Sequence, residues 1–253
     1  MAEEKTGLLS PNSTPDVAEM PAPEVLFEDW GLIPFAEAWE KQLNYVRKHT
    51  EPKLHSRLHG LPFTPATNHL VFCQHPHVYT LGKSGSESNL LISEEERKRL
   101  EIEYFHIERG GDITYHGPGQ LVGYPLFDLE QFKPDLHVYL RNLELSIIDM
   151  LTHFGIVATV YPGLTGVWIE PETPQARKIA AIGIKCSRWV TMHGFALNID
   201  TDLSFFQHIV PCGIQDKAVT SIRAELKDSG PTFSEVSEVL KSKLQSRFGF
   251  RFV

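Results

Sequence analysis

Four short runs rich in β-branched and aromatic residues follow one another in the second half of the chain, and they restrict the possible folds more than any other feature. Proline, glycine and threonine residues punctuate the sequence between them. Such punctuation is typical of turns between neighbouring strands. The runs cover residues 156–161, 166–170, 178–185 and 189–199. We therefore expect successive antiparallel strands.

Three other segments carry apolar residues at the 3- and 4-residue spacing of amphipathic helices. The first extends from residue 33 to about 49, and the second from 136 to 154, where Gly155 is placed as a helix stop. The third begins at Thr232, which forms a capping-box pattern with Glu235. We expect amphipathic helices at these positions.

The remaining patterned segments complete a mixed architecture. Further strands are expected at residues 68–81, 102–107 and 121–129, and a short exposed helix within 90–100. Strands that alternate irregularly with helices predict the α/β class, of the α+β type, with a mixed and largely antiparallel sheet flanked by helices. Residues 1–24 hold four prolines among polar residues, which predicts a disordered tail and leaves a single domain over residues 25–253.

Composition excludes several function classes. The chain has 253 residues and a net charge of -8, which disfavours nucleic acid as a partner because phosphate binding needs a basic surface. It has no run of eighteen apolar residues and no apolar signal core, so we expect neither a membrane span nor secretion. Its three cysteines are odd in number and lack metal-ligand spacing, which favours a reducing cytoplasm.

One local concentration of positive charge stands out in this acidic chain. Arg177, Lys178, Lys185 and Arg188 fall within twelve residues. Such a cluster is a candidate surface for an acidic partner. For Lys185 and Arg188, a solvated strand face is an equally good interpretation.

Residues 109 to 120 combine backbone freedom with polar side chains. The segment reads Arg-Gly-Gly-Asp-Ile-Thr-Tyr-His-Gly-Pro-Gly-Gln, and its four glycines allow close approach of a ligand to the main chain. Arg109, Thr114, Tyr115, His116 and Gln120 add a cation, hydroxyls, an imidazole and an amide. We interpret the segment as part of a site, although a well hydrogen-bonded turn remains the alternative for Pro118 and Gly119.

Cys212 is a candidate nucleophile. It lies in Val-Pro-Cys-Gly-Ile, just before residues 216–226, whose apolar spacing fits a helix. The positive end of a helix lowers the pKa of a thiol, and the thiolate is the form that attacks acyl groups. A small buried hydrophobe is the ordinary alternative for a cysteine. Cys73, inside an apolar run, is expected to be structural.

A thiol near its ordinary pKa needs a partner to be ionised at neutral pH. The candidates are Lys178, Lys185, His116 and His193. Lys178 is flanked by small and apolar residues, where desolvation would weaken its preference for the charged form and suit it as a proton acceptor. Cys186 lies on the same expected strand, about 26 Å away at 3.3 Å per residue, so it is expected to be structural.

Two further patterns carry less weight. Residues 191–198 place Gly194 and Ala196 either against a flat ligand or where a neighbouring element packs closely. The twelve histidines show no His-Glu-x-x-His spacing and no paired cysteine, so no metal and no other cofactor is expected.

Four segments together resemble the lipoyl(octanoyl) transferases, the lipoate-protein ligase B family. They are Arg109 to Gln120, Lys178-Ile-Ala-Ala-Ile-Gly183, His193-Gly-Phe-Ala-Leu-Asn198 and Pro211-Cys212-Gly213, in this order and spacing. The resemblance extends from about residue 25 to 226 and includes an early glycine-ended loop at residues 75–82.

The resemblance implies a fold similar to the biotin and lipoate protein ligases and a role in lipoate biosynthesis. It implies transfer of octanoyl or lipoyl from acyl carrier protein to a lysine of lipoyl domains, in 2-oxoacid dehydrogenase complexes and in the glycine cleavage H protein. Residues 25–253 would then form the octanoyltransferase catalytic domain.

The resemblance also assigns roles to residues. Cys212 would carry the acyl group as a thioester, and Lys178 would lower the pKa of the thiol and shuttle its proton. The residues expected to bind the acyl group are Arg109, Gly110, Gly111, Asp112, Ile113, Thr114, Tyr115, His116, Ala181, Ile182, Gly183, Gly194, Phe195 and Ala196. His116 is a possible helper in proton transfer.

The chemistry sets this hypothesis apart from two alternatives. Exchange of one thioester for another, followed by amide formation, needs no ATP, and the sequence has no P-loop. An ATP-dependent lipoate or biotin ligase on the same fold would use a free acid instead. A non-catalytic module that binds acyl groups or carrier protein would need neither Cys212 nor Lys178.

Overall fold

A large sheet forms the centre of the molecule. The computed structural model describes residues 21–63, 65–210, 218–227 and 230–253. Across the sheet the strands follow the order β12 (Arg251–Phe252), β1 (Glu24–Leu32), β2 (Asn68–Gln74), β6 (Gln120–Leu126), β10 (Val190–Asn198), β9 (Arg177–Ser187), β8 (Leu164–Ile169) and β7 (Thr159–Tyr161), with β11 (Ala218–Val219) also beside β9. The pairs of β1 with β2 and β12, and of β11 with β9, are parallel, and the other pairs are antiparallel.

Strands β7 to β10 form the predicted antiparallel series, so that prediction is confirmed. The turn between β9 and β10 places Arg188 and Trp189 at φ of 49° and 66°. Two-residue hairpin turns need positive φ at their central positions, which non-glycine residues adopt at some cost. The chain nevertheless closes this hairpin tightly, with Val190 paired to Ser187.

A smaller sheet lies beside the large one. Its strands have the order β4 (Glu103–His106), β3 (Val78–Leu81) and β5 (Ile113–His116). Strand β5 lies inside the glycine-rich segment 109–120, for which no strand was expected. The segment is therefore a loop that runs into a strand, and its side chains alternate between two faces from Ile113 onward.

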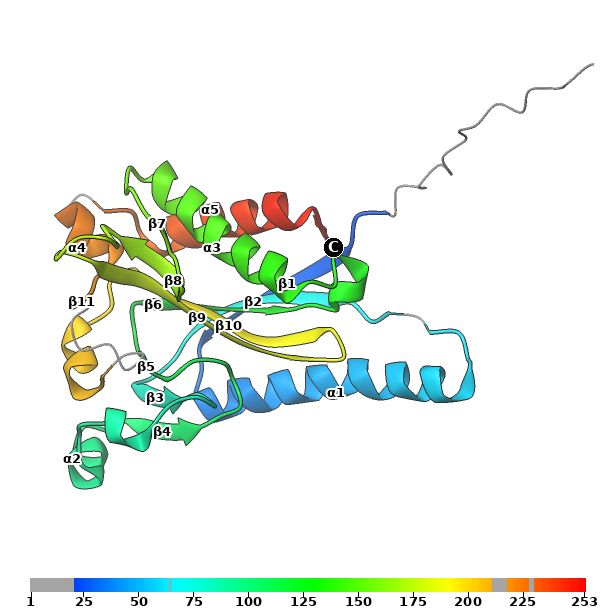
Figure 1. Ribbon diagram of the computed structural model, residues 1–253, viewed down its shortest axis with the longest axis horizontal. Coiled ribbons are helices and arrows are strands. Elements are labelled where there is room, and N and C mark those ends of the chain that lie inside the picture. Colours follow the sequence, from blue (N-terminus) through cyan, green and yellow to red (C-terminus); the bar gives the residue numbers. More distant parts are fainter. Residues whose placement is uncertain (1–20, 64, 211–217, 228–229) are drawn as a thin grey trace, which may run out of the picture.

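Helices cover both faces of the large sheet (Figure 1). Helices α3 (Leu136–His153) and α5 (Phe233–Phe248) pack on one face, and α1 (Phe35–His59) runs along the other. Leu143, Ile147 and Leu240 belong to the core under the paired helices, and burial of each such side chain contributes roughly 1.5–3 kcal/mol. The shorter helices are α2 (Glu94–Arg99), α4 (Ile222–Leu226) and the 3-10 turns η1 (Glu87–Asn89), η2 (Leu129–Gln131) and η3 (Leu203–His208).

The first helix is longer than predicted. It continues past residue 49 through Pro52 to His59. Proline removes a helix hydrogen bond, but the next residue, Lys53, is buried and its Nζ lies 2.6 Å from Asp128 Oδ1. This tertiary ion pair holds the second half of the helix against the sheet.

Two other expectations need correction or extension. The segment 216–226 was expected to fit a helix, but its described part begins as strand β11, and α4 starts only at Ile222 after the Ser221 cap. Strand β1 was not foreseen, because Val25 is its one fully buried residue and the alternation is weak. The expected capping box of Thr232 and Glu235 is present at the start of α5.

Residues 1–20 of the expected tail lie outside the described residues, so the division of the chain at residue 24 stays a prediction. Among the helices that the structure describes, none is long and apolar enough to cross a bilayer.

Candidate active site

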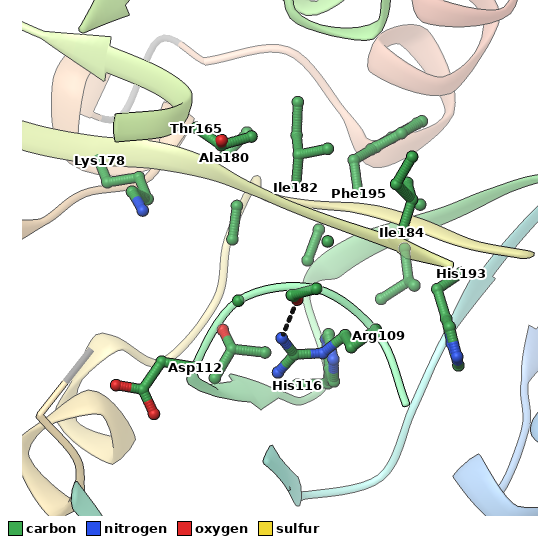
Figure 2. A pocket seen from close by; sticks show the side chains of 18 of the residues that line it. Arg109, Asp112, His116, Thr165, Lys178, Ala180, Ile182, Ile184, His193 and Phe195 are labelled. Carbon is green, nitrogen blue, oxygen red and sulfur yellow. Dashed lines mark hydrogen bonds between the residues drawn. The ribbon is translucent and has the colours of Figure 1, made fainter. Parts of the chain in front are cut away.

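A cavity of about 400 Å³ lies where the two sheets meet. Its volume is within the range of small-molecule sites, roughly 300–1,000 Å³. Residues of β9 and β10 and the loop before β5 line it, together with residues from α1, β6 and the β7–β8 turn. Figure 2 shows Arg109, His116 and Lys178 on one side of the β9–β10 pair.

A strip of small residues forms one wall of the cavity. In the antiparallel register, Ala181 faces Ala196 and Gly183 faces Gly194. A Cβ atom at Gly183 would lie 2.8 Å from the carbonyl oxygen of Gly110. At Gly194 it would lie 2.1 Å from the carbonyl oxygen of Gly123, on the neighbouring strand. Both glycines are therefore required by close backbone approach, and the wall stays open.

The loop before β5 forms the opposite wall and is bonded to the large sheet and to the segment that follows β3. The N–H of Gly110 donates to the carbonyl of Ile184 on β9, at 2.8 Å. The carbonyl of Gly111 accepts from the Ser84 hydroxyl at 2.9 Å, and Gly111 itself has a φ of 85°, which favours glycine. These bonds fix the distance between the loop and the strip of small residues.

Arg109 holds a positive charge at this wall. Its side chain is largely buried, with 8% of the residue exposed. The guanidinium donates to the carbonyl of Thr80 at 2.6 Å, to the Thr80 hydroxyl at 3.0 Å and to the carbonyl of Gly110 at 3.0 Å. These bonds immobilise the cation on β3.

His116 is held in a single hydrogen-bonding arrangement. Its Nδ1 lies 2.7 Å from Oε1 of Gln120, whose amide nitrogen donates to Asn198 Oδ1 at 2.9 Å. Because the Gln120 oxygen accepts, Nδ1 carries the proton. Burial, with help from nearby His75 and Arg109, lowers the pKa of His116 to about 3. His116 is therefore neutral at pH 7 and poorly matched to proton transfer there.

Lys178 reaches the cavity through an irregularity in β9. Val167 pairs with Ala180 but Trp168 pairs with Lys178, so Ile179 is an extra residue of a bulge. In Figure 2, Lys178 points to the opposite side of the strand from Ala180 and Ile182. Its Nζ lies 4.7 Å from the centre of the Trp168 ring, a cation–π contact.

Most of the predicted acyl-binding residues line this cavity. They are Arg109, Gly110, Gly111, Asp112, Ile113, Thr114, His116, Ala181, Ile182, Gly183, Gly194, Phe195 and Ala196, and Lys178 lines it too. Ile182 and Phe195 belong to the face toward α3, opposite Lys178 and Arg109 (Figure 2). Cys212 lies outside the described residues, so its role stays a prediction.

Tyr115 differs from the other residues predicted to bind the acyl group. It does not line the cavity, because alternation along β5 directs its side chain away from Thr114 and His116. Its hydroxyl bonds His77 Nδ1 at 2.8 Å, and its ring stacks on Phe205 with a centroid distance of 5.0 Å. Tyr115 is part of the packing between the small sheet and η3.

Several residues of the wall were not predicted from the sequence. Phe35, at the start of α1, stacks on His116 with ring centroids 6.2 Å apart, and nothing in its sequence context indicated this. His193 was considered only as a partner for the thiol, and Asn198 only as the end of a motif. The glycine-rich signal that drew attention to Gly194 also flanked His193 and was the available clue.

The two described cysteines are not activated thiols. Burial raises the pKa of the Cys73 thiol, and burial likewise raises that of Cys186. Both cysteines fit the structural role expected for them. Within the described ranges, no group of three or more His, Cys, Asp or Glu residues is arranged to hold a metal ion.

The expected basic cluster is partly neutralised. Arg177 forms ion pairs with Glu225 and Glu170, each at 2.6 Å, and Lys185 pairs with Glu108. This supports the solvated-face interpretation for Lys185 and reduces the charge available to an acidic partner.

Comparison with solved structures defines the class of fold. A putative lipoate protein ligase, Ta0514 from T. acidophilum with bound lipoic acid, superposes with a TM-score of 0.61 at 12% identity, covering 92% of this chain and 88% of that one. A bi-partite archaeal lipoate protein ligase from Thermoplasma acidophilum, described with its E2 lipoyl domain, gives a TM-score of 0.62 at 16% identity, covering 92% and 86%. The chain has the lipoate protein ligase fold, and the predicted fold class is confirmed.

Sequence relatives define the family. Residues 45–245 match the lipoyl protein ligase A/B catalytic domain. An octanoyltransferase of Cytophaga hutchinsonii is 57% identical over 206 residues, 80% of this chain and 84% of that protein. An octanoyltransferase of Christiangramia forsetii is 48% identical over 225 residues, 89% and 96%. The chain belongs to the lipoyl protein ligase A/B catalytic-domain family, and the predictions of an acyltransferase and of octanoyl transfer in lipoate biosynthesis are confirmed.

Proposed function

We propose that this enzyme takes octanoyl from acyl carrier protein, holds it as a thioester on Cys212 and passes it to a lysine of a lipoyl domain. The observation that carries the proposal is the position of Lys178. Lys178 lies on the cavity wall, beside the strand where the chain returns from the segment that contains Cys212.

Described residues on both sides of that segment support the pairing of Cys212 with Lys178. Val219, which follows the segment, pairs with Lys178 across β11 and β9, and the N–H of Thr220 donates to the carbonyl of Lys178 at 2.9 Å. Before the segment, the N–H of Val210 donates to the carbonyl of Asn89. Asn89 in turn bonds Asp112 on the cavity wall at 2.6 Å. Cys212 is two positions beyond Val210 in the sequence.

The first half-reaction forms the acyl-enzyme. The amine of Lys178 accepts the proton of the Cys212 thiol, and the thiolate attacks the carbonyl of the carrier thioester. The bond from the carbonyl carbon to the carrier sulfur breaks, and the carrier thiolate recovers the proton from Lys178. One thioester replaces another, so no external energy source is consumed.

The second half-reaction forms the amide. The acceptor lysine is protonated in solution at neutral pH and must lose a proton before its nitrogen can attack. Its neutral amine then attacks the acyl-enzyme, the bond to Cys212 sulfur breaks, and Lys178 takes the proton that the attacking nitrogen releases. Backbone N–H groups are natural donors to the developing oxyanion. The N–H groups of Gly110 and Gly119 already donate to the Ile184 carbonyl and to Gln74 Oε1, so other backbone N–H groups must stabilise the oxyanion.

Lipoyl-domain proteins are the acceptors that the family supports. Within this class we propose the lipoyl domains of 2-oxoacid dehydrogenase complexes and the glycine cleavage H protein. The cytoplasm is the proposed location, because the pattern of cysteine use favours a reducing compartment.

The test is an incubation of the full chain with octanoyl-carrier protein and a lipoyl domain, without ATP. Mass spectrometry should detect octanoyl on Cys212 before the domain is added and on the domain afterwards. Full transfer activity in the Cys212→Ser variant would refute the proposed thioester intermediate. Transfer that needs ATP and free octanoate would instead select a ligase.

Lys178→Arg is the companion variant. Arginine keeps the positive charge but does not release a proton near neutral pH, so we expect acyl transfer to fall at least a hundredfold while the circular dichroism spectrum stays unchanged. Near-normal turnover of the Lys178→Arg variant at pH 7 would show that Lys178 does not transfer protons in this reaction.

A further inference from the structure

Asn198 ends β10 on the cavity wall, and its buried amide is bonded on both sides. Its Oδ1 accepts from Gln120 Nε2 at 2.9 Å, and its Nδ2 donates to the carbonyl of Thr220 at 3.0 Å. Gln120 in turn holds His116, and Thr220 directly follows β11. One side chain thus connects the wall beside His116 to the strand that pairs with Lys178.

Asn198 lies at a junction of two strands on one edge of β9. Strand β8 covers the other edge of this part of β9. On the edge away from β8, β10 pairs with β9 as far as Ala180, and β11 takes its place at Arg177 and Lys178. Because β10 is antiparallel to β9 and β11 is parallel to it, the carboxyl ends of β10 and β11 meet there. The bond from Asn198 to Thr220 bridges this change of strand.

Thr220 is held on three sides. Its N–H donates to the carbonyl of Lys178 at 2.9 Å, its carbonyl accepts from Asn198, and its hydroxyl donates to Glu225 Oε1 at 2.6 Å. Glu225 is fixed in turn by two bonds from Arg177, at 2.6 and 2.7 Å. The ladder between β11 and β9 has only two residue pairs, so it holds the returning chain weakly by itself. The two side-chain bonds add further points of attachment.

The position of Thr220 matters because the two reactive side chains come from different segments. Lys178 lies on β9, and Cys212 precedes β11 in the chain. The distance between the thiol and the amine therefore depends on how firmly the returning chain is held at Lys178. A displacement of about 1 Å at a reacting group can lower a rate roughly hundredfold.

We propose that Asn198 is a positioning residue for octanoyl transfer, because it holds Thr220 beside Lys178 and so fixes the thiol relative to the amine. It acts through its donor to the Thr220 carbonyl. Loss of this donor should slow the reaction without weakening the binding of the acyl group. This inference rests on the proposed function, since it assumes that Cys212 and Lys178 react together.

The test is Asn198→Leu in the full chain, with octanoyl-carrier protein as donor and a lipoyl domain as acceptor. Leucine has the same branched shape but neither donates nor accepts, so the Thr220 carbonyl loses its donor. We expect kcat to fall roughly thirtyfold to hundredfold. The KM and the dissociation constant of octanoate, measured by calorimetric titration, should change by less than about threefold.

A pH profile adds a readout that a merely structural role would not move. The rate at which iodoacetamide alkylates Cys212, followed by peptide mass spectrometry, reports the ionisation of its thiol. In Asn198→Leu the pH midpoint of this rate should rise, because the thiolate lies further from the Lys178 cation.

Thr220→Val is a second variant with a smaller effect on packing. It removes the bond to Glu225, whose carboxylate stays paired with Arg177, and it retains the backbone bonds to Asn198 and Lys178. We expect kcat to fall about fivefold, as for the loss of one hydrogen bond, with octanoate binding unchanged.

Asn68→Leu is the matched control. Asn68 is also a buried asparagine that joins two segments: its Nδ2 donates to the Glu24 carbonyl at 3.1 Å, and its Oδ1 accepts from the Asp128 N–H at 2.8 Å. It lies outside the cavity wall. Asn68→Leu should therefore lower stability and leave kcat and the alkylation profile as in wild type.

The role of Asn198 is overturned if Asn198→Leu keeps the wild-type kcat, if its octanoate binding weakens as much as kcat falls, or if Asn68→Leu loses kcat equally. If Asn198→Leu does not fold, an unchanged kcat in Thr220→Val overturns it. Failure of wild type to transfer octanoyl from carrier protein would refute the proposed donor instead. The alkylation profile then decides on Asn198, and equal pH midpoints in wild type and Asn198→Leu overturn its role.

Discussion

At the scale of single residues, the cavity depends on positions where a side chain is absent. Gly183 and Gly194 face each other across β9 and β10, and each lies against a carbonyl of another segment. A pattern of small residues in the sequence indicated either ligand contact or close packing at Gly194. The structure shows close packing at both glycines, and this packing is what leaves the strip open to a ligand.

Gly183→Ala tests this arrangement. The new Cβ would lie 2.8 Å from the Gly110 carbonyl oxygen and 3.2 Å from Arg109 Cδ, so the loop must move. We expect kcat/KM for acyl transfer to fall more than tenfold, with a loss of unfolding free energy of about 1–3 kcal/mol. Gly230→Ala is the control, since its Cβ would meet only ordinary contacts, at 3.8 and 3.9 Å. Wild-type kcat/KM in Gly183→Ala would contradict the expected clash.

Side-chain direction marks the limit of prediction at this scale. The sequence motif pointed to Arg109, Asp112 and His116, which line the cavity, because polar residues among glycines are typical of sites. It did not indicate that Tyr115 points away, since the segment was not expected to contain a strand. The direction of the Lys178 side chain depends on a bulge in β9, and that of His193 depends on its own left-handed backbone conformation. Neither feature could be recognised from the local sequence.

At the scale of elements, the long first helix shows how a buried ion pair overrides local sequence. The polar stretch after position 49 predicted a helix end there. Lys53 instead inserts between Asp128, Glu130 and the carbonyl of Arg188, which lie far away in sequence. By contrast, α3 and α5 were predictable, because their apolar spacing and caps agree with their tertiary packing.

Lys53→Met should therefore destabilise the protein strongly. It leaves the carboxylate of Asp128 buried without its cation, for which we expect a loss of about 3–5 kcal/mol in urea unfolding. The double variant Lys53→Met with Asp128→Asn should recover part of that loss. Lys98→Met, which removes an exposed pair with Glu94, should change the unfolding free energy by less than about 1 kcal/mol. Equal losses in Lys53→Met and Lys98→Met would show that the buried pair does not hold the helix.

At the scale of the whole molecule, three buried histidines gather where the two sheets meet. Burial lowers the pKa of His75 to about 4. Burial is also the largest cause that lowers the pKa values of His116 and His193 to about 3. In the unfolded chain each takes up a proton near pH 6.5. Below that pH the unfolded state binds more protons than the folded state, so stability is complete above pH 6.5 and falls as the pH drops.

The free energy of unfolding should thus fall by roughly 2 kcal/mol per buried histidine between pH 7 and pH 5. Urea titrations at the two pH values measure this difference. In His75→Gln the difference should shrink by about the share of one histidine, whereas in His55→Gln, on the outer part of α1, it should stay as in wild type. A pH-independent unfolding free energy would mean that the three rings take up protons over the same pH range in the folded and the unfolded state.

The sequence was sufficient to predict a mixed sheet flanked by helices. It was not sufficient to predict that a second sheet packs beside the first. Periodicity identifies strands and helices one at a time, which sufficed for the class of fold. It contains no information on which strands leave the main sheet, and β3, β4 and β5 form a separate one. The cavity lies at that junction, so its position followed only from the assembled chain.

The stack of Tyr115 on Phe205 joins the small sheet to η3. The Tyr79 hydroxyl also donates to the carbonyl of Phe205 at 2.8 Å, so the small sheet and η3 are clamped together at two points. The small sheet bears one wall of the cavity, and η3 leads directly to Val210. Any movement that widens the cavity by shifting the small sheet must also pull on the chain that leads to Cys212. The width of the cavity and the position of the chain at Val210 are therefore coupled.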